Sequence, residues 1–196
     1  MQIESAKEYI LNLLKEKLPK YLTYHCFEHT IDVYNEAKRI ALSENINDET
    51  ELKLILTAAL FHDSGFTVSE LSHEQQSCII STQVLPQYNY NDSQISKICE
   101  IIMATKIPQS PSSHLAEIIC DADLDYLGRN DFEKISDSLF EEFKYRNIVK
   151  DQKSWDTIQL NFFKSHHYFT RTNIELRNKQ KEKNLQKILE NLNNYV

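Results

Sequence analysis

Three short segments of the chain place histidines and carboxylates close together. Imidazole nitrogens and carboxylate oxygens are the ligands that divalent metals of intermediate softness take from proteins. A metal site is therefore the first chemistry to consider for these stretches, which are YHCFEHTIDV (24–33), ALFHDSGF (59–66) and IICDADLDYLG (118–128).

The middle segment carries a His-Asp doublet at the end of an apolar stripe. Apolar residues with helical spacing precede it, and one further turn along the same face reaches His62 and Asp63. An adjacent imidazole and carboxylate on the core side of a helix are costly unless they are paired or bind a metal. The alternative is that Asp63 caps the helix end beside a hydrogen-bonded His62.

The third segment has three carboxylates within five residues. At about 100° per residue, Asp123 lies at the edge of the apolar stripe, Asp121 further round towards solvent, and Asp125 on the opposite flank. The three repel one another unless a cation or hydrogen-bond donors lie nearby. This spacing favours Asp123 as the inward carboxylate, and the alternative is a solvated acidic turn that ends at Gly128.

In the first segment, His25 and His29 are four residues apart and can share one face of a helix or its first turn. They could be two metal ligands, a ligand and an acid, or ordinary surface histidines. Taken together, the segments offer two imidazoles and two carboxylates on helices that pack around one core. That set suits a divalent metal with open coordination positions.

The elements that would position these residues are helices. The chain has two glycines and four prolines among 196 residues, too few turn residues for a β-rich fold of this length. Apolar spacing and the capping pairs Ser5/Glu8, Ser72/Gln75 and Asn130/Glu133 predict an all-α helical bundle. The predicted helices span residues 4–18, 27–44, 48–63, 73–85, 92–104, 114–127, 131–147, 152–169 and 173–193.

A single domain over residues 1–196 fits this length, with a core at about 21–130 and C-terminal helices at 131–193 packing on it. The proline- and serine-rich stretch 107–113 is too short for an interdomain linker. A net charge of -7 argues against a nucleic-acid partner bound through a broad basic face. The chain has no apolar run long enough to span a membrane, and its four separate cysteines indicate reduced thiols in the cytoplasm.

The metal-binding pattern resembles the HD superfamily of metal-dependent phosphohydrolases. These proteins have a His on one helix, a His-Asp doublet on a later one and a distant Asp, which His29, His62-Asp63 and Asp123 match in order. The surrounding HTIDV, AALFHDSGF, HEQQS and DADLDYLG agree as well. The stretch 155–177, with its HHYFT, is similar to the C-terminal part of one uncharacterised branch of predicted metal-dependent phosphohydrolases.

The resemblance implies hydrolysis of a phosphomonoester or phosphodiester, with His29, His62, Asp63 and Asp123 as ligands of a divalent ion (Mn, Mg, Co, Ni, Zn or Fe). A metal lowers the pKa of its bound water to about 7 and so prepares it to attack phosphorus. The resemblance also implies that Asp63 is a catalytic residue. Tyr24-His25 and His29 are similar to an element of cyclic-nucleotide phosphodiesterases, which implies that His25 protonates the leaving oxygen. The expected substrate is a nucleotide or another small phosphorylated anion.

Some relatives bind a second metal through further histidines. His73 and Glu74 could serve here, but Thr105 and Lys106 stand where the next histidine would be expected, and a mononuclear site is predicted. His114 is expected to be a surface residue at a helix start. Four cations are further candidates for phosphate contacts, although a solvent-exposed position is the favoured expectation for each: Lys106, Arg129, Arg146 and Arg171.

Two other functions remain open. A di-iron oxygenase of the inositol-oxygenase kind uses this scaffold but needs more histidine ligands than the chain offers at matching places. A catalytically silent nucleotide-binding regulatory module would keep the metal and lose turnover. Oxygen uptake by an iron-loaded protein would indicate the first, and nucleotide binding without product the second.

Overall fold

The computed structural model describes residues 1–195; Val196, where the predicted domain ends, lies outside them. Across the described residues the chain forms helices and no strand, which confirms the predicted all-α bundle. Three short 3₁₀ helices, η1 (Ser64–Thr67), η2 (Leu85–Tyr88) and η3 (Asp125–Gly128), join the longer elements. The α-helices are α1 (Ile3–Lys17), α2 (Phe27–Ser43), α3 (Glu49–Phe61), α4 (His73–Val84), α5 (Asp92–Met103), α6 (His114–Asp123), α7 (Phe132–Tyr145), α8 (Gln152–Ser165) and α9 (Arg171–Asn193).

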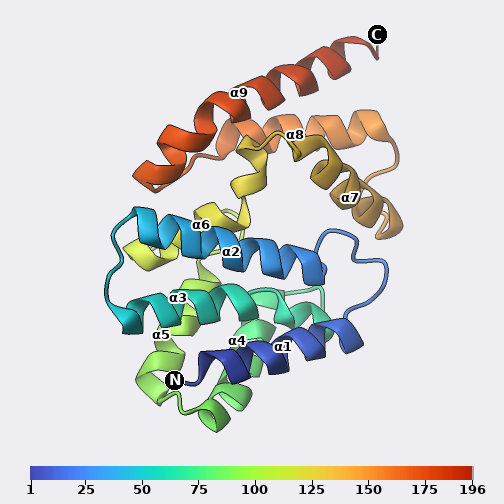
Figure 1. Cartoon of the computed structure of the whole chain (residues 1–196). Helices are drawn as coiled ribbons and strands as arrows, with labels where there is room; N and C mark the ends of the chain where they lie inside the picture. Colours follow the sequence, from blue (N-terminus) through green and yellow to red (C-terminus); the bar gives the residue numbers. More distant parts are fainter. Residues whose placement is uncertain (196) are drawn as a thin grey trace.

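The first six α-helices pack around one apolar core. Helix α2 lies against α3 and α6, and α3 also contacts α1 and α5. Figure 1 shows these helices in the lower part of the molecule, with α7, α8 and α9 above them. Buried apolar side chains from all six helices fill this core. Fully buried examples are Ile10, Ile40, Leu60, Ile98 and Ile119.

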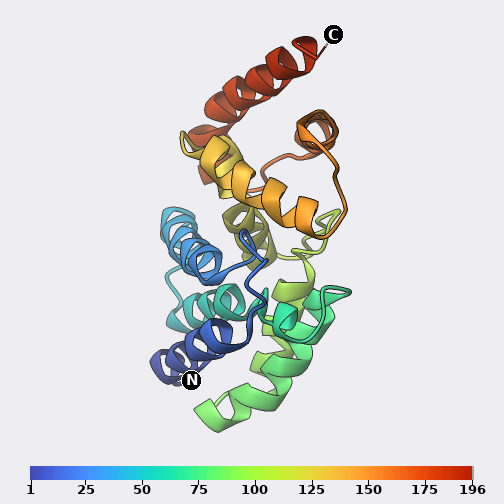
Figure 2. The same ribbon diagram turned by 90° about the vertical axis from the view of Figure 1, so that its right-hand side faces the viewer.

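The three C-terminal helices cover the end of α6. Helix α9 packs along η3 and α8, and α7 also contacts η3. A second apolar cluster, which includes Leu127, Phe132, Phe163 and Ile188, fills the space between them. The turned view in Figure 2 shows the same stacking of α7–α9 on the body formed by α1–α6. The acidic run at 121–125 therefore lies between the two groups of helices.

Most predicted helices agree with the structure to within two residues at each end. The two exceptions, α6 and α8, each end four residues before the predicted position. Helix α6 ends at Asp123, and the chain continues as the tighter η3. Helix α8 ends at Ser165 because His166 is extended, with ψ 138°, and the chain reaches α9 through an extended loop.

The predicted capping pairs are wrong. Helix α1 begins before Ser5, Ser72 makes no side-chain cap in a left-handed conformation (φ 55°), and α7 begins after Asp131 without a side-chain cap. Capping boxes form instead at Asn91 with Gln94 and at Asp151 with Ser154. The pattern alone does not distinguish these pairs, since each has a short polar residue followed three places on by another.

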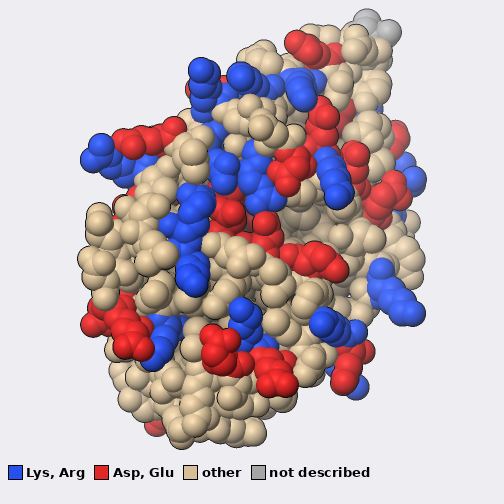
Figure 3. Space-filling model, viewed as in Figure 1, with Lys and Arg blue, Asp and Glu red and all other residues tan. Residues whose placement is uncertain are grey.

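Charged side chains of both signs are interspersed on the face shown in Figure 3, which carries α2 and α9. None of the helices in residues 1–195 combines the length and apolar character that crossing a membrane requires. The four cysteines carry free thiols; Cys120 is buried and the others are half-buried.

Gly128 allows α9 to pack directly on η3, and this contact generates a test of the fold. A Cβ at this position would lie 2.5 Å from Cβ of Arg177 and 2.6 Å from its carbonyl oxygen. We expect Gly128→Ala to lower the free energy of unfolding by about 1–3 kcal/mol, since α9 must move. Urea denaturation measures this, with Asn130→Ala, at an exposed neighbouring position, as the control. A Gly128→Ala protein as stable as the control would contradict the close packing of α9.

Candidate metal centre

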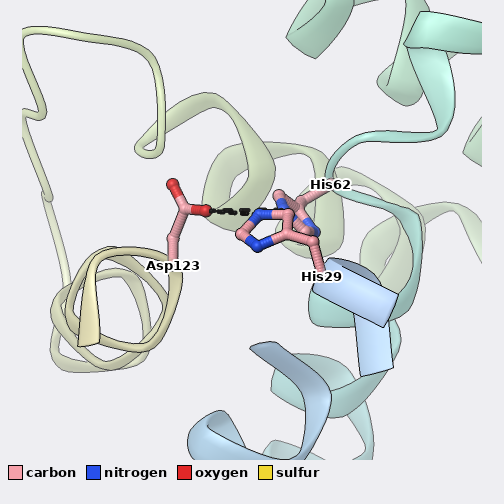
Figure 4. Close-up of side chains that lie close together, drawn as sticks. All are labelled: His29, His62 and Asp123. Carbon is pink, nitrogen blue, oxygen red and sulfur yellow. Dashed lines mark hydrogen bonds and ion pairs between the residues drawn. The ribbon is translucent and has the colours of Figure 1, made fainter. Parts of the chain in front are cut away.

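Three predicted ligands from three helical elements point toward one another. His29 lies on α2, His62 directly follows α3, and Asp123 ends α6, as Figure 4 shows. Nε2 of His29 is 3.1 Å from Oδ1 of Asp123 and 3.4 Å from Nε2 of His62. Nε2 of His62 is 3.6 Å from the same Asp123 oxygen. One ligand atom from each residue thus lies within 4.8 Å of the other two.

The fourth predicted ligand, Asp63, completes the cluster. Its Oδ2 lies 3.5 Å from Nε2 of His29 and 3.2 Å from Nε2 of His62. That oxygen is buried and has no hydrogen-bond partner. A buried carboxylate oxygen without a donor is costly, and a cation placed among these four groups would remove the cost.

The spacing of the four groups fits a divalent ion. Ligand atoms about 2.1 Å from one ion lie roughly 3.0–3.4 Å from one another in octahedral or tetrahedral geometry. The distances of Nε2 of His29 and of His62 from each other and from the nearest oxygen of each aspartate, 3.1–3.6 Å, are close to that range. His62 also has its tautomer set, because its Nδ1–H donates to the carbonyl oxygen of Ala59 at 2.8 Å. Nε2 then presents a lone pair to the cluster, the arrangement in which histidine binds metals.

Without an ion, protons hold the cluster together. Burial lowers the pKa of His62, but the negative charges of Asp63 and Asp123 outweigh it and raise that pKa well above its usual value. Burial raises the pKa of Asp123, yet hydrogen bonds with His29 and His62 bring it down to about 2. The same histidines lower the pKa of Asp63 against its burial. Both carboxylates are therefore ionised and available to a metal.

The neighbouring carboxylates of the acidic run have structural partners. Asp121 was predicted to face solvent, which is wrong, since it is fully buried. It accepts hydrogen bonds from the backbone N–H groups of Phe169 and Thr170, each at 2.8 Å, and from the Thr170 hydroxyl. The residues just before α9 therefore pack on the face of α6 that carries Asp121, outside its apolar stripe. Asp125, also fully buried, is neutralised by Arg39 and Arg177 and accepts a further hydrogen bond from the Asn173 amide.

His25 lies beside the cluster and is held by a residue that the sequence analysis missed. Its Nδ1–H donates to Oε1 of Glu142 at 2.6 Å, and the other Glu142 oxygen accepts the backbone N–H groups of Tyr24 and His25. Burial lowers the pKa of His25, but the Glu142 hydrogen bond and the charge of Asp63 raise it overall. Nε2 of His25 is left free, and the ring packs against Phe66 with centroids 4.4 Å apart.

Glu142 is fully buried on α7, 117 residues beyond His25. The sequence does carry a signal for Glu142, because its carboxylate lies on the same helical face as the apolar residues Ile135, Leu139 and Phe143.

His73 and Glu74 lie on the other side of Asp63, as the beginning of α4. Nε2 of His73 is 3.6 Å from Oδ1 of Asp63 and 3.5 Å from Oε1 of Glu74. Asp63 therefore presents one oxygen to the histidine pair and the other to His73. The arrangement is compatible with a second ion. However, Thr105 occupies the place where a further histidine ligand would be expected, and its hydroxyl donates to the Ile102 carbonyl.

The four cations that were candidates for phosphate contacts do not line the cavity beside this cluster. Arg129 binds Asp32 and Asp131, and Arg146 binds Glu70 and Glu142. Arg171 is 83% exposed beside Glu175. Lys106 is exposed, and it does not line the cavity beside the cluster. His114, predicted to be a surface residue, is exposed at the start of α6 and contacts Glu117.

A cavity of about 310 Å³ opens from the cluster toward the C-terminal helices. Its polar end contains His25, Asp63, His73, Glu74 and Asp123. Its opposite wall, which we term the apolar chamber, comes from α7 and α8 and consists of Leu139, Phe143, Trp155, Ile158, Phe162 and Phe163. A cavity of this size suits a small ligand.

Residues 26–125 match the family model described as the HD domain. The chain belongs to the HD-domain family. The matched range contains all four residues of the cluster and ends just before the C-terminal helices. An uncharacterized protein from Clostridium beijerinckii is 30% identical over 122 residues, which cover 59% of this chain and 75% of that protein.

Two solved structures share the fold over nearly the whole chain. A predicted HD superfamily hydrolase from an uncultured Thermotogales bacterium is similar, with a TM-score of 0.62 and 20% identity over 96% of this chain and 92% of that one. Bacillus subtilis YpgQ, solved in complex with ADP, has a TM-score of 0.64 and 20% identity over 96% and 95% of the two chains. The likeness extends through α7–α9, beyond the range of the family model.

The positions of Asp121 and Asp123 predict opposite results when each is replaced. We expect Asp123→Ala and His29→Ala to lose metal and keep the fold, because they remove ligands. Asp121→Ala should keep metal and lose about 1–3 kcal/mol of stability for each buried donor left unpaired. Elemental analysis and urea denaturation of the same samples measure both quantities.

The purified protein should carry about one divalent ion per chain. A count of two, reduced in part by His73→Ala, would establish a dinuclear centre. If Asp121→Ala emptied the site while Asp123→Ala left it full, the ligand assignment would be wrong.

Proposed function

We propose that this HD-domain protein is a metal-dependent phosphohydrolase that cleaves a phosphomonoester or phosphodiester in a small anionic substrate. The observation that carries the proposal is the cluster of His29, His62, Asp63 and Asp123, whose two aspartates line the polar end of the cavity. A divalent ion held there would lower the pKa of water and offset the negative charge that builds up on phosphoryl oxygens.

The residues of the chain supply orientation and a proton. His62 is buried and held by its hydrogen bond to the Ala59 carbonyl, so its ligand nitrogen is oriented before substrate arrives. His25 lines the same cavity with its Nε2 free, and its raised pKa favours the protonated form that a general acid needs. Proton transfer from Nε2 to the leaving oxygen would leave the Nδ1–H···Glu142 hydrogen bond intact. Glu142 is then a positioning residue for His25.

A nucleotide is the substrate class to test first. YpgQ, which shares the fold, has been solved with ADP, and the polar end of the cavity here has the carboxylates and histidines that would hold a phosphate through an ion. Support for a nucleotide in this chain rests on that likeness and on the site chemistry together.

The test of the proposed function is metal removal and return. Hydrolysis of a panel of phosphate esters should fall to background after complete chelation, because the sequence has no nucleophile elbow, no glycine-rich phosphate loop and no CxxC motif. Added manganese, cobalt, nickel or magnesium should restore it. Asp121→Asn, whose site is retained, is the matched control for Asp123→Asn. Turnover that persists in a fully metal-free sample would contradict the mechanism.

A second test isolates the proton donor. His25→Ala should keep its metal and lose roughly 10²–10⁴-fold in kcat on a nucleoside or alkyl ester. The loss should be smaller on a nitrophenyl ester, whose leaving oxygen needs little protonation. Glu142→Gln should lower kcat less and move the high-pH limb of the kcat profile to lower pH, because the hydrogen bond that raises the pKa of His25 is weakened. Equal losses on both esters would remove His25 from the acid role.

A further inference from the structure

The wall of the cavity opposite the metal cluster is almost entirely hydrocarbon. In the apolar chamber, α7 contributes Leu139 and Phe143, and α8 contributes the other members, including Trp155 and Phe163. Trp155 and Phe163 are each 4% exposed, and Phe143 packs edge-on against the indole with ring centroids 5.5 Å apart. Two aromatic side chains of the chamber are thus packed in place, whereas Leu139, Phe143 and Phe162 are half-buried and Ile158 is 37% exposed.

Polar groups in this wall are already bonded within the protein. Gln159 accepts the Ser136 hydroxyl at 2.6 Å through Oε1, and its Nε2 donates to Asp156 at 3.2 Å. The indole Nε1–H of Trp155 donates to the same Ser136 oxygen at 3.2 Å. A ligand in the chamber therefore meets ring faces and aliphatic carbons, with little hydrogen bonding on offer.

The cavity also lacks lysine and arginine side chains within the described residues, and its histidines, His25 and His73, lie at the polar end. That end also carries the carboxylates of Asp63, Glu74 and Asp123. Arg129 and Arg146 are held elsewhere by carboxylates. A phosphate bound at the metal cluster can be neutralised there, but a second one further along would be buried unpaired at high cost.

We infer that the substrate carries one phosphoryl group, held at the polar end, on an uncharged and largely apolar group that fills the apolar chamber. This rests on the proposed function and narrows it. Among nucleotides, only monophosphates meet the charge condition, and an ester with a hydrocarbon ring or chain meets both conditions. Leu139, Phe143 and Ile158 are the residues that set this specificity.

Benzyl and ethyl phosphate test the inference, since their leaving alcohols are similar and only the apolar group differs. Each is assayed as the monoester and as its methyl diester, beside AMP and ADP. We expect kcat/KM for the benzyl ester to exceed that for the ethyl ester by about 10–200-fold, the usual effect of an added apolar group in such a pocket. ADP should be used less well than AMP. A benzyl-to-ethyl ratio near one, or a preference for ADP, would overturn the inference.

Ile158→Gln places an amide at the chamber while leaving the metal cluster intact. It should reduce the benzyl-to-ethyl ratio several-fold, because kcat/KM for the benzyl ester should fall more than kcat/KM for the ethyl ester. Ile79→Gln is the matched control, because Ile79 is 47% exposed on α4 and does not line the cavity. An unchanged ratio in Ile158→Gln would remove the chamber from substrate selection.

Binding separates this inference from the proposed function. Calorimetry with benzylphosphonate and ethylphosphonate, on the metal-loaded protein, requires no turnover. Tighter binding of benzylphosphonate, lost in Ile158→Gln, supports the chamber even if no ester is cleaved, and the proposed function would then fall alone. Turnover without any difference between the phosphonates would overturn the chamber and keep the proposed function. Failure of both phosphonates to bind would also overturn the inference.

Discussion

The burial of Asp63 among two histidines is the constraint on which the site depends. Its Oδ2 has no hydrogen-bond donor, and its neighbours are ring nitrogens and a second carboxylate. A charge in such a place is stable only beside a cation, because the interior solvates ions poorly. Without a metal, the protonated imidazole of His62 supplies that positive charge. A divalent ion bound by the same four side chains would also supply it. Three helical elements converge here because α2, α3 and α6 share one core.

Helical periodicity predicted the architecture because the fold has few competing signals. Two glycines and four prolines leave the apolar stripes uninterrupted, and α2, α4 and α5 lie within one residue of the predicted ranges. Asp123 lies beside the two histidines, as the stripe favoured, but with 15% of its side chain exposed it is the least buried of the three carboxylates. The prediction for Asp121 failed because a single helix says nothing about a later element packing on its second face. That element is the loop at Phe169 and Thr170, whose N–H groups bind the carboxylate.

The parts of the site that the sequence analysis missed all come from the C-terminal helices. Glu142 and the apolar chamber lie far along the chain from the metal-binding segments, and their role depends on how α7 and α8 pack over η3 and the polar end of the cavity. The partners of Arg129 and Arg146 could not be predicted from the sequence for a related reason. Arg129 and Arg146 look free in the sequence, yet each lies next to carboxylates that folding brings from other elements. Long-range pairing of this kind has no local pattern.

The arrangement divides the labour between two parts of one domain. Helices within the HD-domain match supply the ligands, and α7 and α8 supply the wall that the substrate would contact and the carboxylate that orients His25. The central claim is that the four-residue cluster holds the metal. Anomalous diffraction from crystals grown with Mn²⁺, recorded on both sides of the manganese edge, tests it most directly. The account predicts a peak about 2.0–2.3 Å from Nε2 of His29, Nε2 of His62 and oxygens of Asp63 and Asp123. A peak elsewhere, with these four side chains bound only to one another, would contradict it.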